Sequence, residues 1–265
     1  MHPLLSARKI YILFVFLTLA ALTCSQVEVK KVNKIVAVIF CDITTSVDST
    51  DGIKSVANNA ANLLLKFPPL SILYFRPIDK SPNVKPIFEF TIPAASNLKG
   101  EKDQRTQHIE TQAQNLYNEI LNRYNEINSD DKNARSCIIQ TLDIANRLFK
   151  PYQESQNYSF ELIYLSDMLE ECDESVLGSL FMKENLCDHV FIKADSFQSD
   201  LDIGFVNLTI ITAVENDVEN SQYFNYENRK TFWKKIFLKV GFSPEQFEKS
   251  HFLPGIPQRF DNLQN

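Results

Sequence analysis

The segment that most constrains the fold is KIVAVIFCD at residues 34–42, in which apolar and β-branched residues follow one another without polar interruption. A continuous apolar run of this length is typical of a strand buried on both faces, as in a parallel sheet covered by helices. The run ends at Asp42 and is followed by ITTSVDSTDG, which is rich in hydroxyls and carboxylates. The segment therefore predicts a buried strand whose carboxyl end carries polar side chains.

Strand-like and helix-like segments alternate along the rest of the chain. Strand patterns lie at 70–78, 86–93, 159–167 and 205–214, and helix patterns lie at 52–67, 109–127, 137–150 and 227–241. Prolines bracket 86–93 and place it at a sheet edge, because proline cannot donate to a strand ladder. Strands separated by helices predict an α/β fold, doubly wound, with a mostly parallel sheet flanked by helices in three layers.

The first 24 residues have the pattern of a signal peptide. Arg8 and Lys9 precede an apolar stretch at 10–22, which is shorter than the about 20 residues that span a bilayer. The letters AALTCSQ around Cys24 resemble a bacterial lipobox, although two positions depart from it. Lipidation of Cys24, ordinary cleavage and an uncleaved anchor are all open. Each predicts export to the periplasm, the cell envelope or the extracellular space, with membrane contact only through the N-terminus.

The chain divides by pattern into a signal peptide at 1–24, a short linker at 25–33, one domain at 34–241 and a C-terminal tail at 242–265. Removal of the leader takes away Arg8 and Lys9, so that the formal charge of −6 becomes −8. An acidic chain of this kind argues against nucleic acid as a partner.

The cysteines divide into two pairs after the leader. Cys172 and Cys187 flank a short helix-like stretch, and in an exported protein they are candidates for a disulfide. Cys41 and Cys137 lie within strongly patterned segments, where the expected state is a buried thiol.

Asp42, Thr44 and Ser46 in DITTS resemble the D-x-S-x-S element of von Willebrand factor A (vWA) domains, whose metal-ion-dependent adhesion site (MIDAS) binds Mg²⁺. Ser136 in SCIIQTLDIA matches the hydroxyl that this family places at the start of a later helix. Asp167 in IYLSD matches the Asp at the end of its next core strand. The resemblance covers about residues 34–241 and implies that these five residues are the metal ligands.

Three positions depart from the family pattern. Thr44 and Ser136 exchange one hydroxyl residue for another, and Met168 stands where the family often has Gly. The hydroxyl exchanges keep an oxygen ligand, and oxygen is what Mg²⁺, and after it Mn²⁺ or Ca²⁺, requires. A cation held mainly by neutral hydroxyls keeps positive charge for a partner's carboxylate. The resemblance thus implies a non-catalytic binding module that engages a protein or acidic ligand through Mg²⁺.

Three other interpretations stay open. One is a metal-free cell-envelope interaction protein of the same fold. Another is a metal-dependent phosphohydrolase using Asp42, although Thr44 stands where haloacid-dehalogenase-type phosphatases need a second acid. The third is purely structural, because Asp at a strand end and Ser before a helix are common as turn and cap residues. No G-x-S-x-G element occurs, and the chain has only 6 glycines, which disfavours glycine-rich phosphate loops.

Overall fold

The computed structural model describes residues 34–44, 50–79, 85–96, 98–128, 136–155, 157–168, 197–212 and 226–263. Its strands are β1 (Lys34–Asp42), β2 (Ile72–Ile78), β3 (Phe88–Thr91), β4 (Tyr158–Leu165), β5 (Asn207–Thr212) and β6 (His251–Pro254). Its α-helices are α2 (Thr50–Lys66), α3 (Lys99–Asn128), α4 (Ile138–Phe149), α7 (Tyr226–Lys239) and α8 (Pro244–Glu248). Two short 3₁₀-helices complete the set, η1 (Lys150–Tyr152) and η3 (Gln258–Phe260). No helix among the described residues has the length and apolar character needed to cross a membrane.

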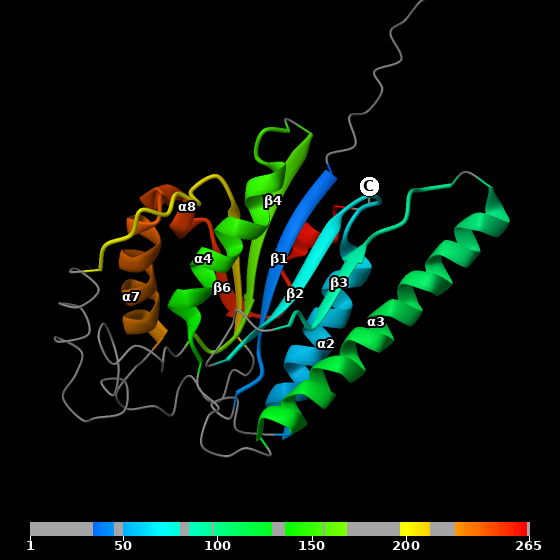
Figure 1. The fold of residues 1–265 in the computed structure, drawn as a ribbon, viewed down its shortest axis with the longest axis horizontal. Coiled ribbons are helices and arrows are strands. Elements are labelled where there is room, and N and C mark those ends of the chain that lie inside the picture. Colours follow the sequence, from blue (N-terminus) through cyan, green and yellow to red (C-terminus); the bar gives the residue numbers. More distant parts are fainter. Residues whose placement is uncertain are drawn as a thin grey trace, which may run out of the picture. The chain divides into compact units, whose positions relative to one another are not determined.

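The strands form one six-stranded sheet in the order β3-β2-β1-β4-β5-β6 (Figure 1). All neighbours are parallel except β2 and β3, which are antiparallel. This arrangement confirms the predicted doubly wound α/β fold, and the proline-bracketed strand β3 lies at the edge as predicted. β1 is central, and eight of its nine residues are buried, which is why the sequence there is a continuous apolar run.

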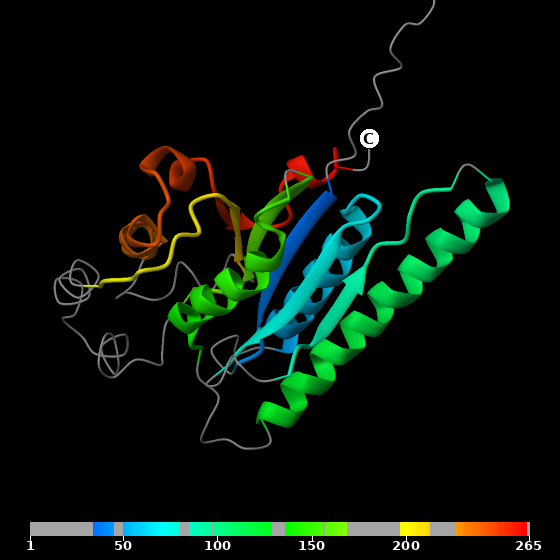
Figure 2. The ribbon, with the colours of Figure 1, turned by 45° about the horizontal axis from the view of Figure 1, so that its top comes forward.

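Alternate residues of each strand enter two separate cores. Val36, Val38 and Phe40 pack with α4 and α7 on one face of the sheet. Ala37 and Ile39 pack with α2 on the other. The long helix α3 lies beside α2 at the β3 edge of the sheet (Figure 2), and its buried residues belong to the α2 core. Residues that share a strand face therefore share a core, and this parity also decides which polar side chains meet at the strand ends.

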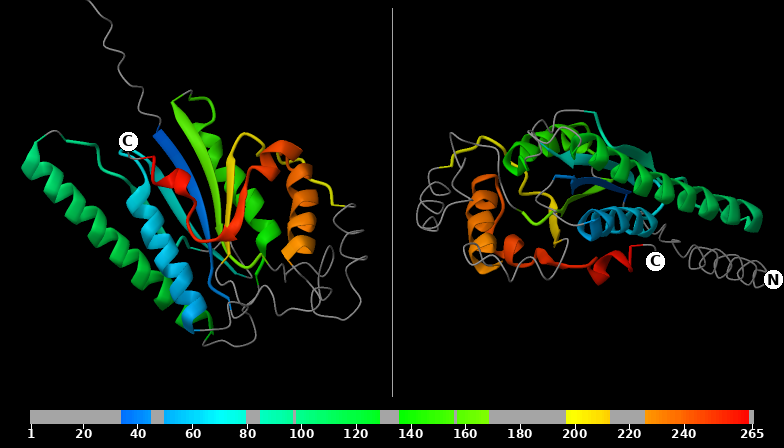
Figure 3. Two further views of the ribbon diagram at one scale, coloured as in Figure 1. Left: turned by 180° about the vertical axis from the view of Figure 1, so that it is seen from behind. Right: turned by 90° about the horizontal axis from the view of Figure 1, so that it is seen from below.

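The C-terminal segment is part of the folded domain rather than a tail outside it. β6 adds a parallel strand beside β5, and Phe260 is fully buried with its ring 5.8 Å from that of Phe67. Figure 3 shows the part after β6 on the same face of the sheet as α2. No strand pattern is visible here in the sequence, because β6 is only four residues long and contains a proline.

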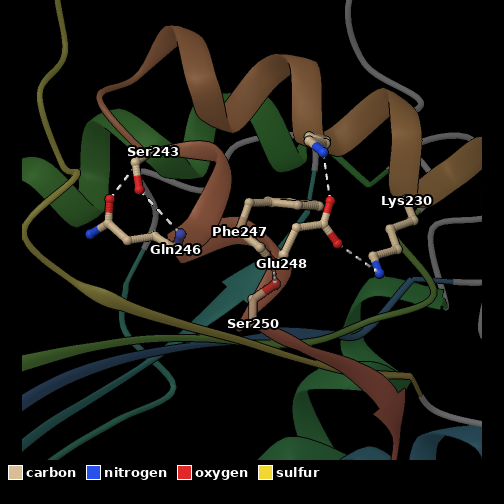
Figure 4. A network of polar contacts seen from close by, with 7 residues as sticks. Lys230, Ser243, Gln246, Phe247, Glu248 and Ser250 are labelled. Carbon is tan, nitrogen blue, oxygen red and sulfur yellow. Dashed lines mark hydrogen bonds and ion pairs between the residues drawn. The ribbon is translucent and has the colours of Figure 1, made fainter.

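Local hydrogen bonds fix the turn from α7 into α8. Ser243 accepts from the backbone N–H of Gln246, whose side chain in turn accepts from the backbone N–H of Ser243 (Figure 4), and this capping box begins α8. Glu248 pairs with Lys230 and Lys234 of α7, at 3.5 and 2.5 Å, and the two lysines lower the pKa of its carboxyl group. These contacts tie α8 to α7 ahead of β6.

Candidate metal centre

Asp42 is the last residue of β1, and its carboxylate is completely buried. Its Oδ1 accepts two hydrogen bonds from Thr44, one from the backbone N–H at 3.2 Å and one from the hydroxyl at 2.7 Å. The chain thus folds back on itself within two residues of the strand end, and the Thr44 hydroxyl is brought against the carboxylate. The DITTS pattern placed Asp42 and Thr44 at one site, and the structure brings their oxygen atoms together.

Two further hydroxyls reach the same carboxylate from distant parts of the chain. Ser136, just before α4, lies 3.2 and 3.3 Å from the two Asp42 oxygens and 2.7 Å from the Thr44 hydroxyl. Ser166, just after β4, donates to Asp42 Oδ2 at 2.7 Å. Thr44 after β1, Ser166 after β4 and Ser136 at the start of α4 therefore converge on one carboxylate, at the edge where parallel sheets bind ligands.

The structure brings some of the five predicted ligand residues together and not others. Asp42, Thr44 and Ser136 are brought together as expected, whereas Ser46 lies outside the described residues. Asp167 is half-buried, and its backbone carbonyl accepts a hydrogen bond from Arg229 of α7 at 2.7 Å.

Ser166 is the residue that the sequence assignment missed. It stands beside Asp167 at the same strand end, so either could have been chosen. Strand parity distinguishes them, because Leu162 and Tyr164 pack in the α4 and α7 core as Phe40 does. Ser166 continues that parity and Asp167 does not. In addition, Cys41 pairs with Leu165, so that the next positions on the two strands are Asp42 and Ser166.

The same row continues onto the next strand. Leu165 also pairs with Ile211, so Thr212 at the end of β5 follows Asp42 and Ser166 across the sheet. Thr212 is 3% exposed, and its hydroxyl has no hydrogen-bond partner among the residues that the structure describes. The Thr212 hydroxyl at the carboxyl edge is therefore not used in any hydrogen bond among the described residues.

The Asp42 carboxylate has no cationic partner among the described residues. Its hydrogen bonds come from Thr44, Ser136 and Ser166. Burial raises the pKa of Asp42, and the hydrogen bonds from Thr44, Ser166 and Ser136 oppose that rise. Burial likewise raises the pKa of the neighbouring Cys41 thiol, and the Asp42 carboxylate adds to that rise. The site is thus a desolvated acidic group supported by neutral dipoles alone.

Helix α7 holds the loop that carries Ser166. Besides the Arg229 contact, the Trp233 indole N–H donates to the carbonyl of Met168 at 2.9 Å, and the Met168 N–H donates to the Ser166 hydroxyl at 2.8 Å. Met168 is fully buried with a φ of 62°, a left-handed conformation that suits glycine better than methionine.

The donor set suits a small hard cation. One carboxylate and three hydroxyls supply oxygen only, which is the ligand type that Mg²⁺, Mn²⁺ and Ca²⁺ share. The described residues contain no group of three or more His, Cys, Asp and Glu side chains that could hold a metal. Asp42, Thr44, Ser136 and Ser166 are each 0% exposed, so the oxygen atoms available to a cation at this position are buried ones.

The cysteines differ in part from the sequence expectation. Cys41 is a free, buried thiol as predicted. Cys137, which was also expected to be a buried thiol, is disulfide-bonded. Its partner lies outside the described residues, as do Cys24, Cys172 and Cys187. Because Cys137 adjoins Ser136, the covalent bond anchors the start of α4 directly beside the candidate site. A buried cysteine in a patterned segment carries no sequence signal that separates the two states.

No protein-family model matches this sequence, and no curated protein matches it. Among solved structures, the chain is similar to a von Willebrand factor type A protein from Catenulispora acidiphila, at 9% identity and a TM-score of 0.42, covering 86% of this chain and 40% of that chain. It is also similar to the manganese-loaded TRAP protein of Plasmodium vivax, at 12% identity and a TM-score of 0.36, covering 76% of this chain and 62% of that chain. The chain spans less than two thirds of either structure, and these likenesses concern the fold and assign no residue.

Proposed function

We propose that the protein is an exported vWA-like binding module that holds Mg²⁺ at the carboxyl edge of its sheet and engages a protein or acidic ligand there. The observation that carries the proposal is the buried Asp42 carboxylate, on which the hydroxyls of Thr44, Ser136 and Ser166 converge and for which the described part of the chain provides no cationic partner. A desolvated carboxylate without countercharge is costly, and a bound cation removes that cost.

The residues have distinct roles in this proposal. Asp42 supplies the negative charge that binds the cation, and the three hydroxyls orient it and complete the oxygen shell, with Ser46 and Asp167 as further ligands. When bound, Mg²⁺ supplies a Lewis-acidic position that accepts an oxygen of an acidic partner. Because the hydroxyls are neutral, they leave most of the positive charge unquenched. No proton transfer or nucleophile is required, so the proposed module is not an enzyme.

Location is proposed from the leader alone. The signal-peptide pattern at 1–24 directs the domain to the periplasm, cell envelope or extracellular space, with Cys24 as a candidate lipid anchor.

Calorimetric titration of the purified protein with Mg²⁺, Mn²⁺ and Ca²⁺ tests the metal claim. Wild type is expected to bind one cation, and Asp42→Asn is expected to abolish the heat because the charge is lost while the shape is kept. Ser136→Ala and Ser166→Ala each remove one oxygen and are expected to weaken binding. Asp143→Asn, which changes an exposed carboxylate on α4, is the matched control and is expected to bind as wild type does. Absence of binding by wild type would refute the metal site.

The second candidate function is a metal-free interaction module of the same fold. Complete burial of Asp42 and its hydroxyl partners favours it, since the short Thr44–Ser136 and Ser166–Asp42 contacts satisfy these groups without a metal. For that function, the protein would give no heat with any of the three cations, and removal of metal with EDTA would leave its melting temperature unchanged.

A further inference from the structure

A groove of about 760 Å³ lies at the opposite end of the sheet from Asp42. It is lined by the first three residues of β4, by Asn207 at the start of β5, and by side chains from the end of α4, from η1 with the turn after it and from the loop before β5. The amino ends of parallel strands lie at the edge opposite their carboxyl ends, so the groove shares no residue with the candidate metal centre. Its volume is within the range of small-ligand sites.

One wall of the groove is a fixed aromatic ring. Phe205 is 42% exposed, yet its ring packs edge-on against two buried rings, those of Phe149 at 6.1 Å and Phe160 at 5.2 Å. Phe149 and Phe160 also contact each other edge-on, at 5.4 Å. The exposed ring is therefore held in place by a buried aromatic pair, and it offers a rigid apolar surface to the groove.

The side chain of Asn207 belongs to the other face of the sheet. Its NH₂ donates to Glu161 at 3.0 Å, and Glu161 is in turn held by two hydrogen bonds from Arg259, at 3.0 and 2.7 Å. Phe160 and Leu162 on either side of Glu161 pack in the α4 and α7 core, so Glu161 and the Asn207 paired with it point to the α2 face. Asn207 therefore lines the groove at the start of β5, but its side-chain amide is used within the protein.

The remaining polar groups are balanced in charge. Asn146 and Gln153 line the groove with amides that both donate and accept, and Lys150 and Asp202 contribute one charge of each sign. A phosphate or sulfate ligand would require a cationic cluster, and a lipid tail would require an apolar lining. The lining instead suits a neutral molecule with many hydroxyls and one apolar face.

We propose that this groove binds a neutral saccharide, with the apolar face of one sugar ring against Phe205 and its hydroxyls hydrogen-bonded to Asn146 and Gln153. This binding is separate from the proposed metal-dependent function and does not depend on it. The protein would then have a polyhydroxylated ligand at one end of the sheet and an acidic ligand at the other.

The test is binding of the purified protein to immobilised neutral oligosaccharides built from glucose, galactose, mannose or N-acetylglucosamine, with heparin as a charged comparison. Production in a bacterial host avoids an N-glycan, since Asn207 begins an Asn-Leu-Thr sequence. At least one neutral oligosaccharide is expected to bind, in EDTA as well as in Mg²⁺. Phe205→Ala is expected to weaken that binding about tenfold, as loss of an aromatic contact does. Leu65→Ala, at an apolar residue of α2 that is 36% exposed, is the matched control and is expected to leave oligosaccharide binding unchanged.

A second variant separates the amide contacts from the ring. Gln153→Ala removes an exposed groove amide and is expected to weaken the same interaction without lowering the melting temperature. Binding to none of the neutral oligosaccharides, binding to heparin alone, or equal binding by wild type, Phe205→Ala and Gln153→Ala would each overturn the proposal. Binding that required Mg²⁺ would also overturn it, whereas loss of Mg²⁺ binding in calorimetry would bear only on the other site.

Discussion

Two buried carboxylates of this domain are stabilised in different ways. Glu161, inside β4, is 3% exposed and forms a two-bonded pair with Arg259. Asp42, at the end of β1, is 0% exposed and is surrounded by hydroxyls. Glu161 therefore has a built-in countercharge, which is the usual requirement for a buried acid, and Asp42 has none among the described residues. The cation proposed above would supply Asp42 with the countercharge that the described residues do not provide.

The largest expected effect comes from supplying that cation. At a Mg²⁺ concentration 100 times the dissociation constant, binding to the folded state alone is expected to stabilise wild type by about 2.7 kcal/mol. Asp42→Asn should lose this increment, because an amide keeps the shape and lacks the charge. Glu161→Gln, the matched change at the other carboxylate, should keep it. The measurement is urea unfolding with Mg²⁺ and with EDTA.

An equal increment in wild type and Asp42→Asn would place the Mg²⁺ effect elsewhere in the protein. The comparison between the two carboxylates would then fail, and the hydroxyls around Asp42 would be structural.

Removal of the Glu161 countercharge is expected to have the next largest effect. Breaking a fully buried pair costs about 3–5 kcal/mol, but the Arg259 side chain is 40% exposed, so Arg259→Ala is expected to cost about 2 kcal/mol after screening is considered. Arg147→Ala, which breaks an exposed pair with Asp143, should cost less than about 0.5 kcal/mol. Equilibrium unfolding of both variants checks the difference. A cost for Arg259→Ala as small as that for Arg147→Ala would mean that Glu161 needs no countercharge.

The pH dependence of stability should also report Glu161. Burial raises the pKa of this carboxyl group above its ordinary value, although Arg259 and Asn207 oppose the rise. The folded state then favours the protonated form. Protonated Glu161 therefore contributes to the free energy of unfolding. This contribution is fully present below the ordinary pKa of Glu and is lost as the pH rises through the folded-state pKa. Glu161→Gln should remove this part of the pH profile, and Arg259→Ala should move it to higher pH. Identical profiles for wild type and Glu161→Gln would contradict the assignment.

Much of the fold follows from local patterns in the sequence. The run at 34–42 predicted β1 to the residue, because a strand covered on both faces has no polar positions to confuse its limits. The stripe at 109–127 predicted the buried part of α3, but the helix begins at Lys99, where its residues are polar and exposed and carry no periodic signal. β6 was missed, since four residues ending in proline are stable only beside β5.

The candidate site was predictable where it is local and less so where it depends on tertiary structure. Asp42 and Thr44 are two residues apart, and the DITTS pattern placed both at one site. That Ser166 also reaches Asp42 depends on which face of β4 lies opposite Asp42, and that is decided by the pairing of β1 with β4. The disulfide at Cys137 depends on the course of the chain through space, which spacing along the sequence does not give.

The smallest expected effect concerns Thr212, which follows Asp42 and Ser166 across the carboxyl edge. A buried hydroxyl without a partner costs desolvation energy and gains no hydrogen bond. Thr212→Val keeps the branched shape and removes the unpartnered oxygen, so it is expected to stabilise the protein by about 1 kcal/mol. Thr141→Val is the matched control, because the Thr141 hydroxyl donates to the Ile138 carbonyl at 2.6 Å and lies 2.8 Å from the Tyr164 hydroxyl. It is expected to destabilise by about 1 kcal/mol.

Urea unfolding of both variants in EDTA measures these opposite signs. Destabilisation by Thr212→Val would show that its hydroxyl is already paired, so that the carboxyl edge would have no spare oxygen. Stabilisation in EDTA that disappears in Mg²⁺ would instead show that the Thr212 hydroxyl contributes to the stability of the metal-bound form. Asp42, Ser166 and Thr212 would then form one group of oxygen atoms. Their burial would lower the stability of the metal-free protein and raise that of the metal-bound protein. The Glu161 pair should show no such dependence on Mg²⁺, because its countercharge is part of the chain.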